Sequence, residues 1–130
     1  MIINEENYVD EAEKTIKKLN AEVDKRGRQS GVVTTSKIRN LLAMAADIYN
    51  EVVNSKNDIL DKEIIGRIQY MKIRFIYEAG RDTKVKSLVK EGRIIEIIDQ
   101  ISNNKHNYIL FNRYMEALVA FRKFYCGNDE

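Results

Sequence analysis

The chain has 130 residues and no proline, and this absence is the feature that most limits how it folds. Proline is the commonest helix breaker, because its ring removes a backbone donor and clashes with the preceding turn. The apolar residues also recur at spacings of three and four, which is typical of the buried side of a helix. The sequence therefore predicts an all-α protein, a compact bundle of about five helices in a single domain that spans residues 1–130.

The first part of the chain predicts two helices joined by a basic loop. Tyr8 to Val23 carries one apolar face, made of Val9, Ala12, Ile16, Leu19 and Val23. Asp24 to Val33 contains two glycines and a polar cluster, which is typical of a loop, and it is basic through Lys25, Arg26 and Arg28. The second helix opens at Thr34, where hydroxyls can cap free amides. Its buried side is marked by Ile38, Leu41, Leu42, Ala45, Ile48, Tyr49, Val52 and Val53.

The middle of the chain predicts a long helix followed by a bent or broken one. Leu60 to Arg81 is an uninterrupted helical pattern that ends near Gly80, and Asp82 can cap the segment that follows. The apolar face rotates after Gly92, so a kink or break is expected there. The run Ile94–Ile98 could also form a strand, but no other segment offers a strand to pair with it, which favours a helix.

A polar turn from Ser102 to Asn107 precedes the last predicted helix, Tyr108 to Tyr125. This helix is apolar over most of its circumference, which is typical of the central helix of a bundle or of a helix covered by a partner protein. Arg122 falls on the apolar arc, so it must snorkel, pair with an acid, or serve a neighbour. The polar edge is limited to Asn112, Arg113, Glu116 and Lys123.

Two stripes run side by side along the helix predicted for Leu60 to Arg81. One is a core-facing stripe made of Ile64, Ile68, Met71, Phe75 and Ala79. The other, called the Arg/Tyr row below, consists of Arg67, Tyr70, Arg74, Tyr77 and Arg81. Burying three unpaired charges would cost too much desolvation energy, so the row must face solvent or a charged partner. Guanidiniums suit phosphates and tyrosine rings offer stacking surfaces for bases. The alternative is a solvated face whose charges pair locally with Glu63 and Glu78.

The charge distribution adds to this interpretation. The formal net charge is only +2, but residues 61–93 hold nine Lys or Arg against five acids. A local basic excess is typical of a polyanion contact, although an acidic protein could also meet it. Lys37 and Arg39 are a second candidate, because cations at a helix start oppose the helix dipole and a bound phosphate would resolve that conflict.

Catalytic and membrane functions find little support. His106 and Cys126 are the only residues of their types, so neither a His-based metal cluster nor a His-paired nucleophile is expected. No phosphate-binding glycine motif is present, and we predict no enzyme activity and no cofactor. A lone cysteine makes an intrachain disulfide impossible, which favours a reducing cytoplasm. The sequence predicts neither a membrane span nor a secretory signal.

Three segments together resemble the small helical subunit of type III-A CRISPR–Cas (Csm) effector complexes. They are Thr34 to Asn40 (TTSKIRN), Tyr70 to Arg81 (YMKIRFIYEAGR) and Tyr114 to Tyr125 (YMEALVAFRKFY). The segments cover about a quarter of the chain, and their order and spacing extend over nearly all of it. The ending departs from the family pattern, in which a residue such as His is expected at Arg122 and often a glycine at Cys126.

The resemblance implies a compact all-α subunit without catalytic activity. Several copies would stack beside the backbone subunits that hold the guide RNA, and RNA or DNA cleavage would belong to other subunits. The expected partners are guide RNA and target RNA, the backbone and large subunits, and neighbouring copies of the chain, with no membrane. The RNA-binding candidates from the residues, most of them inside the matching segments, are Lys37, Arg39, Arg67, Lys72, Arg74, Arg81 and Lys123.

A second hypothesis needs no RNA contact. The wide apolar arc of Tyr108 to Tyr125 is more than a small bundle obviously needs. It could instead make the chain a helical protein–protein adaptor or a homodimer.

Overall fold

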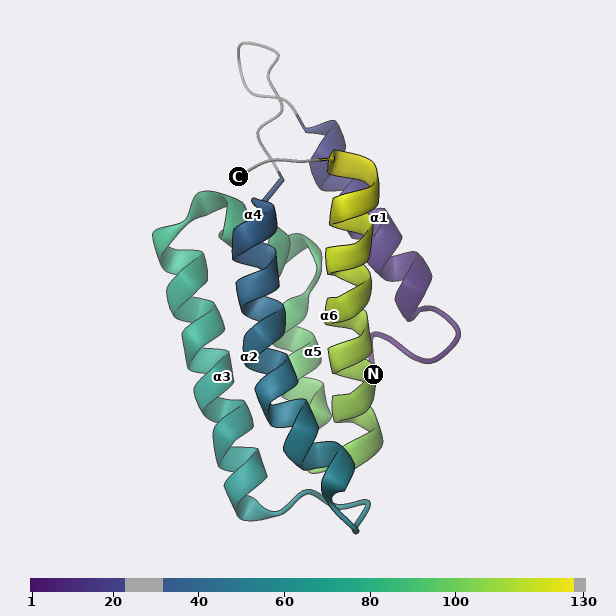
Figure 1. The fold of residues 1–130 in the computed structure, drawn as a ribbon, viewed down its shortest axis with the longest axis vertical. Coiled ribbons are helices and arrows are strands. Elements are labelled where there is room, and N and C mark those ends of the chain that lie inside the picture. The colour runs from purple at the N-terminus through teal and green to yellow at the C-terminus, as the bar shows by residue number, and fades with distance from the viewer. Residues whose placement is uncertain (23–31, 128–130) are drawn as a thin grey trace.

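The helical pattern of the sequence corresponds to six α-helices in the computed structural model, which describes residues 1–22 and 32–127. The all-α prediction is confirmed. The possible break near Gly92 is present, and for this reason the count is six rather than about five. The basic loop predicted from Asp24, with Lys25, Arg26 and Arg28, lies almost wholly outside the described residues. Figure 1 shows the helices, which are α1 (Tyr8–Ala21), α2 (Thr35–Asn54), α3 (Lys62–Arg81), α4 (Thr83–Glu91), α5 (Ile94–Ile101) and α6 (Lys105–Cys126).

Polar side chains define where the helices begin. Thr34 accepts a hydrogen bond from the Lys37 N–H at 3.3 Å, which confirms the predicted start of α2. Asp82 accepts from the Lys84 N–H at 2.9 Å and caps α4, also as predicted. Asn104 accepts from the Asn107 N–H at 2.9 Å, so α6 begins at Lys105 and the predicted start at Tyr108 is wrong. The missed signal is the asparagine cap, which satisfies one of the free amides of the first turn.

The break between α4 and α5 depends on close packing around Gly92. A Cβ at this position would lie 3.0 Å from the Leu88 carbonyl oxygen and 3.3 Å from the Tyr114 hydroxyl. The next residue, Arg93, has a left-handed backbone with φ 51°, which reverses the chain before α5 starts at Ile94. The β-branched run of α5 is helical, as predicted, and its residues Ile94, Ile97, Ile98 and Ile101 are buried.

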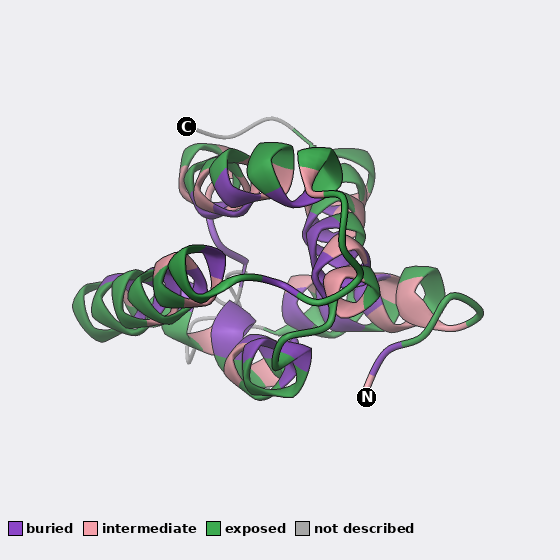
Figure 2. Ribbon diagram, turned by 90° about the horizontal axis from the view of Figure 1, so that it is seen from below, coloured by how far each residue is buried: buried purple, intermediate pink, exposed green. Residues whose placement is uncertain are grey.

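The last helix is the centre of the bundle, which confirms one of the two predicted reasons for its apolar character. α6 packs against α1, α2 and α5, while α3 packs against α2, α4 and α5. In Figure 2, seen along the bundle, the buried residues face the space that the helices enclose. The placement of Asn112 on the polar edge is wrong, since only 4% of it is exposed. Its amide donates to Glu116 at 3.3 Å, one turn further along α6.

Buried polar groups of α6 bond to the backbone of other segments. The Tyr108 hydroxyl donates to the Ala45 carbonyl at 2.7 Å, and the Tyr114 hydroxyl donates to the Gly92 carbonyl at 2.9 Å. Burial raises the pKa of both phenols, because it disfavours the phenolate. Arg122 is only 2% exposed, and its Nε donates to the Val33 carbonyl at 2.6 Å. Of the predicted roles for Arg122, serving a neighbour is observed in this bond to another segment of the chain.

Two apolar residues assigned to buried faces are exposed instead. Val9 is 44% exposed and Val53 is 39% exposed. Each lies in an end turn, at the start of α1 and at the end of α2, where fewer neighbouring helices are available to cover it.

Replacing Tyr114 with Phe should lower the free energy of unfolding by about 1 kcal/mol, because the buried Gly92 carbonyl loses its donor while the ring remains. Urea unfolding measures the difference. Tyr77→Phe is the matched control, since Tyr77 is 60% exposed and its hydroxyl has water available. Equal stabilities of the two variants would show that the bond at Gly92 does not hold the α4–α5 break in place.

Replacing Arg122 with Met should lower the free energy of unfolding by more than Tyr114→Phe does, by about 2 kcal/mol. The missing hydrogen bond involves a charged donor, and its removal leaves the Val33 carbonyl unsatisfied. Arg113→Met removes an exposed arginine from the same helix and should change stability by less than about 0.5 kcal/mol. Thermal and urea unfolding of both variants test the pair. An Arg122→Met protein as stable as Arg113→Met would contradict the anchoring role of Arg122.

Candidate nucleic-acid interface

The Arg/Tyr row lies on the outer side of α3. The core-facing stripe of the same helix is buried as predicted, from Ile64 to Ala79. Tyr70 and Tyr77 are 61% and 60% exposed, and Arg74 and Arg81 are also exposed. Because α3 stands at the edge of the bundle (Figure 1), one face is left for solvent or a partner.

Both ends of α3 are fixed by contacts with other segments. Before its first turn, the Leu60 N–H donates to the Asn103 carbonyl at 2.7 Å, which joins the α2–α3 linker to the α5–α6 turn. After its last turn, Asp82 caps α4 and lies 3.8 Å from Lys37 Nζ. The row is therefore presented on a helix held at both ends.

The three arginines of the row differ in how far they are neutralised. Arg67 forms an ion pair with Glu51 of α2. Arg81 lies 3.9 Å from Glu78 and 5.7 Å from the centre of the Tyr77 ring. Arg74 makes no ion pair with any residue that the structure describes. Of the two acids predicted as local partners, Glu78 is therefore used, whereas Arg67 pairs with an acid of the neighbouring helix instead of Glu63.

These pairs leave the guanidiniums available to an incoming anion. More than half of the Arg81 side chain is exposed, at 54%, and the Arg67 side chain is 37% exposed. An exposed ion pair contributes at most about 1 kcal/mol, because water screens the charges and the side chains lose freedom. A phosphate with better geometry can replace such a carboxylate.

Lys37 and Arg39 lie at the start of α2, beside the end of α3. The approach of Lys37 to Asp82 brings this helix start next to Arg81, the last member of the row. Arg39 is exposed. The structure thus brings the first candidate cluster towards one end of the row, although a carboxylate stands where a phosphate was predicted.

The two remaining candidates lie elsewhere. Lys72 is on the opposite flank of α3, where its Nζ is 2.5 Å from Asp99 of α5, and its side chain is only 27% exposed. Lys123 is exposed near the end of α6. Neither side chain belongs to the Arg/Tyr row.

A groove of about 380 Å³ runs between α2 and α3 along the row. It is lined by Arg67, Tyr70 and Arg74 from the row, and by residues that the sequence patterns did not indicate, among them Met44, Asp47 and Gly66. One residue in the sequence could have indicated this groove. Gly66 stands in the middle of a helix, where glycine costs about 1 kcal/mol relative to alanine, so a special reason for it is expected.

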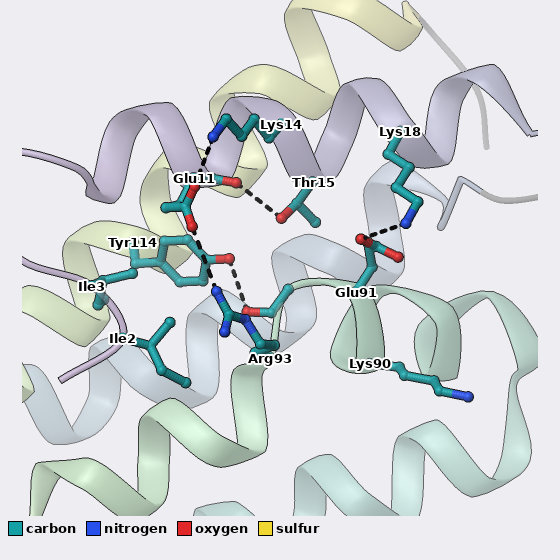
Figure 3. Close-up of a pocket in the computed structure, with 11 residues that line it drawn as sticks. Ile2, Ile3, Glu11, Lys14, Thr15, Lys18, Lys90, Glu91, Arg93 and Tyr114 are labelled. Atoms are coloured by element: carbon teal, nitrogen blue, oxygen red, sulfur yellow. Dashed lines mark hydrogen bonds and ion pairs between the residues drawn. The ribbon is translucent and has the colours of Figure 1, made fainter.

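A second cavity, of about 460 Å³, lies between α1, the α4–α5 break and α6 (Figure 3). Lys18 lies 3.2 Å from Glu91, and Arg93 lies 3.6 Å from Glu11. These ion pairs join α1 to the break. Because Lys14, Lys18 and Arg93 already have acids of the same chain beside them, this cavity is a weaker candidate for an anion than the row.

Other site types receive no support from the described residues. No three His, Cys, Asp or Glu side chains gather there as a possible metal site. Nor is any described helix both long and apolar enough to cross a membrane.

Fold and surface together define a small all-α protein with an exposed basic and aromatic face on α3. The family model described as Csm2 Type III-A matches residues 13–128. The CRISPR system Cms protein Csm2 of Streptococcus thermophilus is 40% identical over 98% of the chain and 98% of that relative. The Csm2 proteins of Enterococcus italicus and Mycobacterium tuberculosis are 36% and 33% identical, over 82% and 75% of the chain and 80% and 79% of the relatives.

The chain therefore belongs to the Csm2 family of type III-A CRISPR systems. This confirms the resemblance to the small helical subunit that the three sequence segments indicated.

The joint between α3 and α4 can be tested at Asp82, which both caps α4 and approaches Lys37. Asp82→Ala should lower the free energy of unfolding by about 1 kcal/mol, because the cap is removed. Asp82→Asn keeps a capping oxygen and loses only the charge, so it should lower the free energy of unfolding by only a few tenths of that amount. Thermal unfolding distinguishes the variants. Equal destabilisation by both would mean that the ion pair with Lys37 outweighs the cap.

Proposed function

We propose that the chain is a non-catalytic small subunit of a type III-A CRISPR–Cas interference complex that contacts the backbone of guide and target RNA. The observation that carries the proposal is the Arg/Tyr row, in which Arg74 stands exposed between two exposed tyrosines. Membership of the Csm2 family supports the assignment to the complex. The presence of a single histidine and a single cysteine supports a role without catalysis.

The RNA contacts are proposed to be to phosphate and sugar. A subunit that serves any guide sequence must bind without reading bases, and backbone contacts carry no direct sequence information. Arg67, Arg74 and Arg81 form the main contact, and Lys37 and Arg39 extend it at the end nearest Arg81. Lys72 and Lys123 do not belong to the Arg/Tyr row, and they suit contacts with protein neighbours better.

The other proposed partners are the backbone and large subunits and further copies of the chain, all in the cytoplasm. Exposed apolar side chains on α3 and α6 support protein contacts of this kind. Ile73 and Ile76 are 60% and 50% exposed on α3, and Phe124 is 78% exposed at the end of α6. These residues would be covered in an assembled complex.

The adaptor hypothesis loses its main motivation in the structure. The apolar arc of α6 is largely used inside the bundle, where Tyr108, Phe111 and Leu118 are fully buried. A homodimer with no RNA affinity would still be recognised by sedimentation of the purified chain.

Replacing Arg67, Arg74 and Arg81 together with Ala should weaken RNA binding by the assembled complex and make it less salt-dependent. The slope of log K against log salt should decrease by roughly 0.7 for each phosphate of a single strand that the variant no longer neutralises. Filter binding over a range of salt concentrations measures both quantities.

The control is the triple alanine variant at Lys14, Lys17 and Lys18, which removes the same charge from α1. Figure 1 shows α1 and α3 on opposite sides of the bundle. This variant should retain affinity and salt slope. If the arginine variant also retains both, the row is ordinary surface and the proposed RNA contact is wrong.

A further inference from the structure

The groove between α2 and α3 has a chemistry that differs from that of the arginine row beside it. We propose that it is a subsite for one unstacked base of the bound RNA, the sugar–phosphate of which lies along the row. This inference rests on the proposed function and adds a base contact to the backbone contacts.

The floor and one wall of the groove suit the flat face of a base. Met44, Ile48 and Met71 supply apolar and thioether surface, and Ile48 and Met71 are almost fully buried beneath the opening. Tyr70 stands at the rim with 61% of its surface exposed. An aromatic ring beside apolar side chains offers stacking, which tolerates any base because every base has a π-face.

The charges of the groove are balanced, which distinguishes it from a phosphate site. Arg67 and Arg74 line it together with two carboxylates, Asp47 and Glu63. A phosphate would be repelled by the carboxylates. A base would use them, because each of the four RNA bases has at least one N–H donor and a carboxylate accepts such bonds. The arginines at the rim remain for the phosphate of the same nucleotide.

The space is the size of a small ligand. Ligand pockets generally begin at about 300 Å³, so a groove of about 380 Å³ has room for a single base. Gly66 keeps this space open, since a Cβ there would meet nothing within 4 Å. A large side chain at this position would therefore enter the groove without disturbing the core.

Two pairs of matched variants test the subsite. Gly66→Leu fills the groove, whereas Gly80→Leu adds the same side chain to the same helix at a glycine that also has open space around it. Tyr70→Leu removes the ring at the rim, whereas Tyr77→Leu removes an equally exposed ring that does not line the groove. Circular dichroism checks that all four variants fold.

The full chain, assembled with the other subunits of its complex, is irradiated with single-stranded RNA that contains 5-iodouridine. Peptide sequencing should then find a crosslink at Tyr70. Gly66→Leu should abolish that crosslink and weaken RNA binding by about tenfold, as expected when one base is no longer stacked. Gly80→Leu should retain both. Tyr70→Leu should weaken binding similarly, and Tyr77→Leu should leave the crosslink at Tyr70 in place.

The outcomes separate the subsite from the backbone contact. If the triple arginine variant loses RNA binding while Gly66→Leu binds normally and the Tyr70 crosslink persists in it, the subsite is overturned and the proposed function stands. If neither variant changes RNA binding, both are overturned. If Gly66→Leu instead loses a protein subunit on purification, the occupant is a protein and the inference fails.

A free nucleotide shares the same chemistry, so uridine monophosphate is the competing probe. The subsite as proposed predicts that it competes only weakly with the oligonucleotide, because it lacks the neighbouring phosphates that the row would hold. Strong competition at equal nucleotide concentration would overturn the RNA assignment.

Discussion

Three buried side chains of α6 are hydrogen-bonded to main-chain oxygens of other segments, and the rest of the bundle depends on these contacts. Tyr108 reaches Ala45 in α2, Tyr114 reaches Gly92 at the α4–α5 break, and Arg122 reaches Val33 before α2. Each bond satisfies a polar group that would otherwise be costly to bury. A mostly apolar central helix could slide or rotate against its neighbours, and these directional contacts determine one arrangement.

The arrangement explains why the Arg/Tyr row of α3 faces outward. α1 and α2 cover α6 along most of its length, whereas α3 touches the bundle mainly through α2, α4 and α5. Its inner stripe is buried against them, so the opposite side must face outward. The chain thus keeps its core around α6 and leaves the outer side of α3, which is fixed at Leu60 and Asp82, exposed.

Sequence periodicity predicted the features that lie within one helix, and missed those that form where two helices pack. The inner stripe of α3, the exposure of its row and the central place of α6 all follow from the spacing of apolar and charged residues along a single helix. The partner of Arg67 is Glu51, sixteen residues away on α2, and no local spacing indicates it. No local spacing indicates the groove either, since Asp47 and Gly66 line it together only when α2 and α3 pack. The misplaced Asn112 shows the limit within one helix, because a polar residue type does not report what covers it.

The same limit applies to the basic excess of residues 61–93. Acids from other helices neutralise part of it, since Arg67 pairs with Glu51, Lys72 with Asp99 and Arg93 with Glu11. A count along the sequence therefore overstates the basic character of this surface. Within the Arg/Tyr row, one arginine remains without an ion pair among the described residues. Arg74 makes no ion pair with a described residue and lies between the exposed rings of Tyr70 and Tyr77, one turn away on either side. Among the three arginines of the Arg/Tyr row, Arg74 therefore presents the least neutralised charge to an approaching anion.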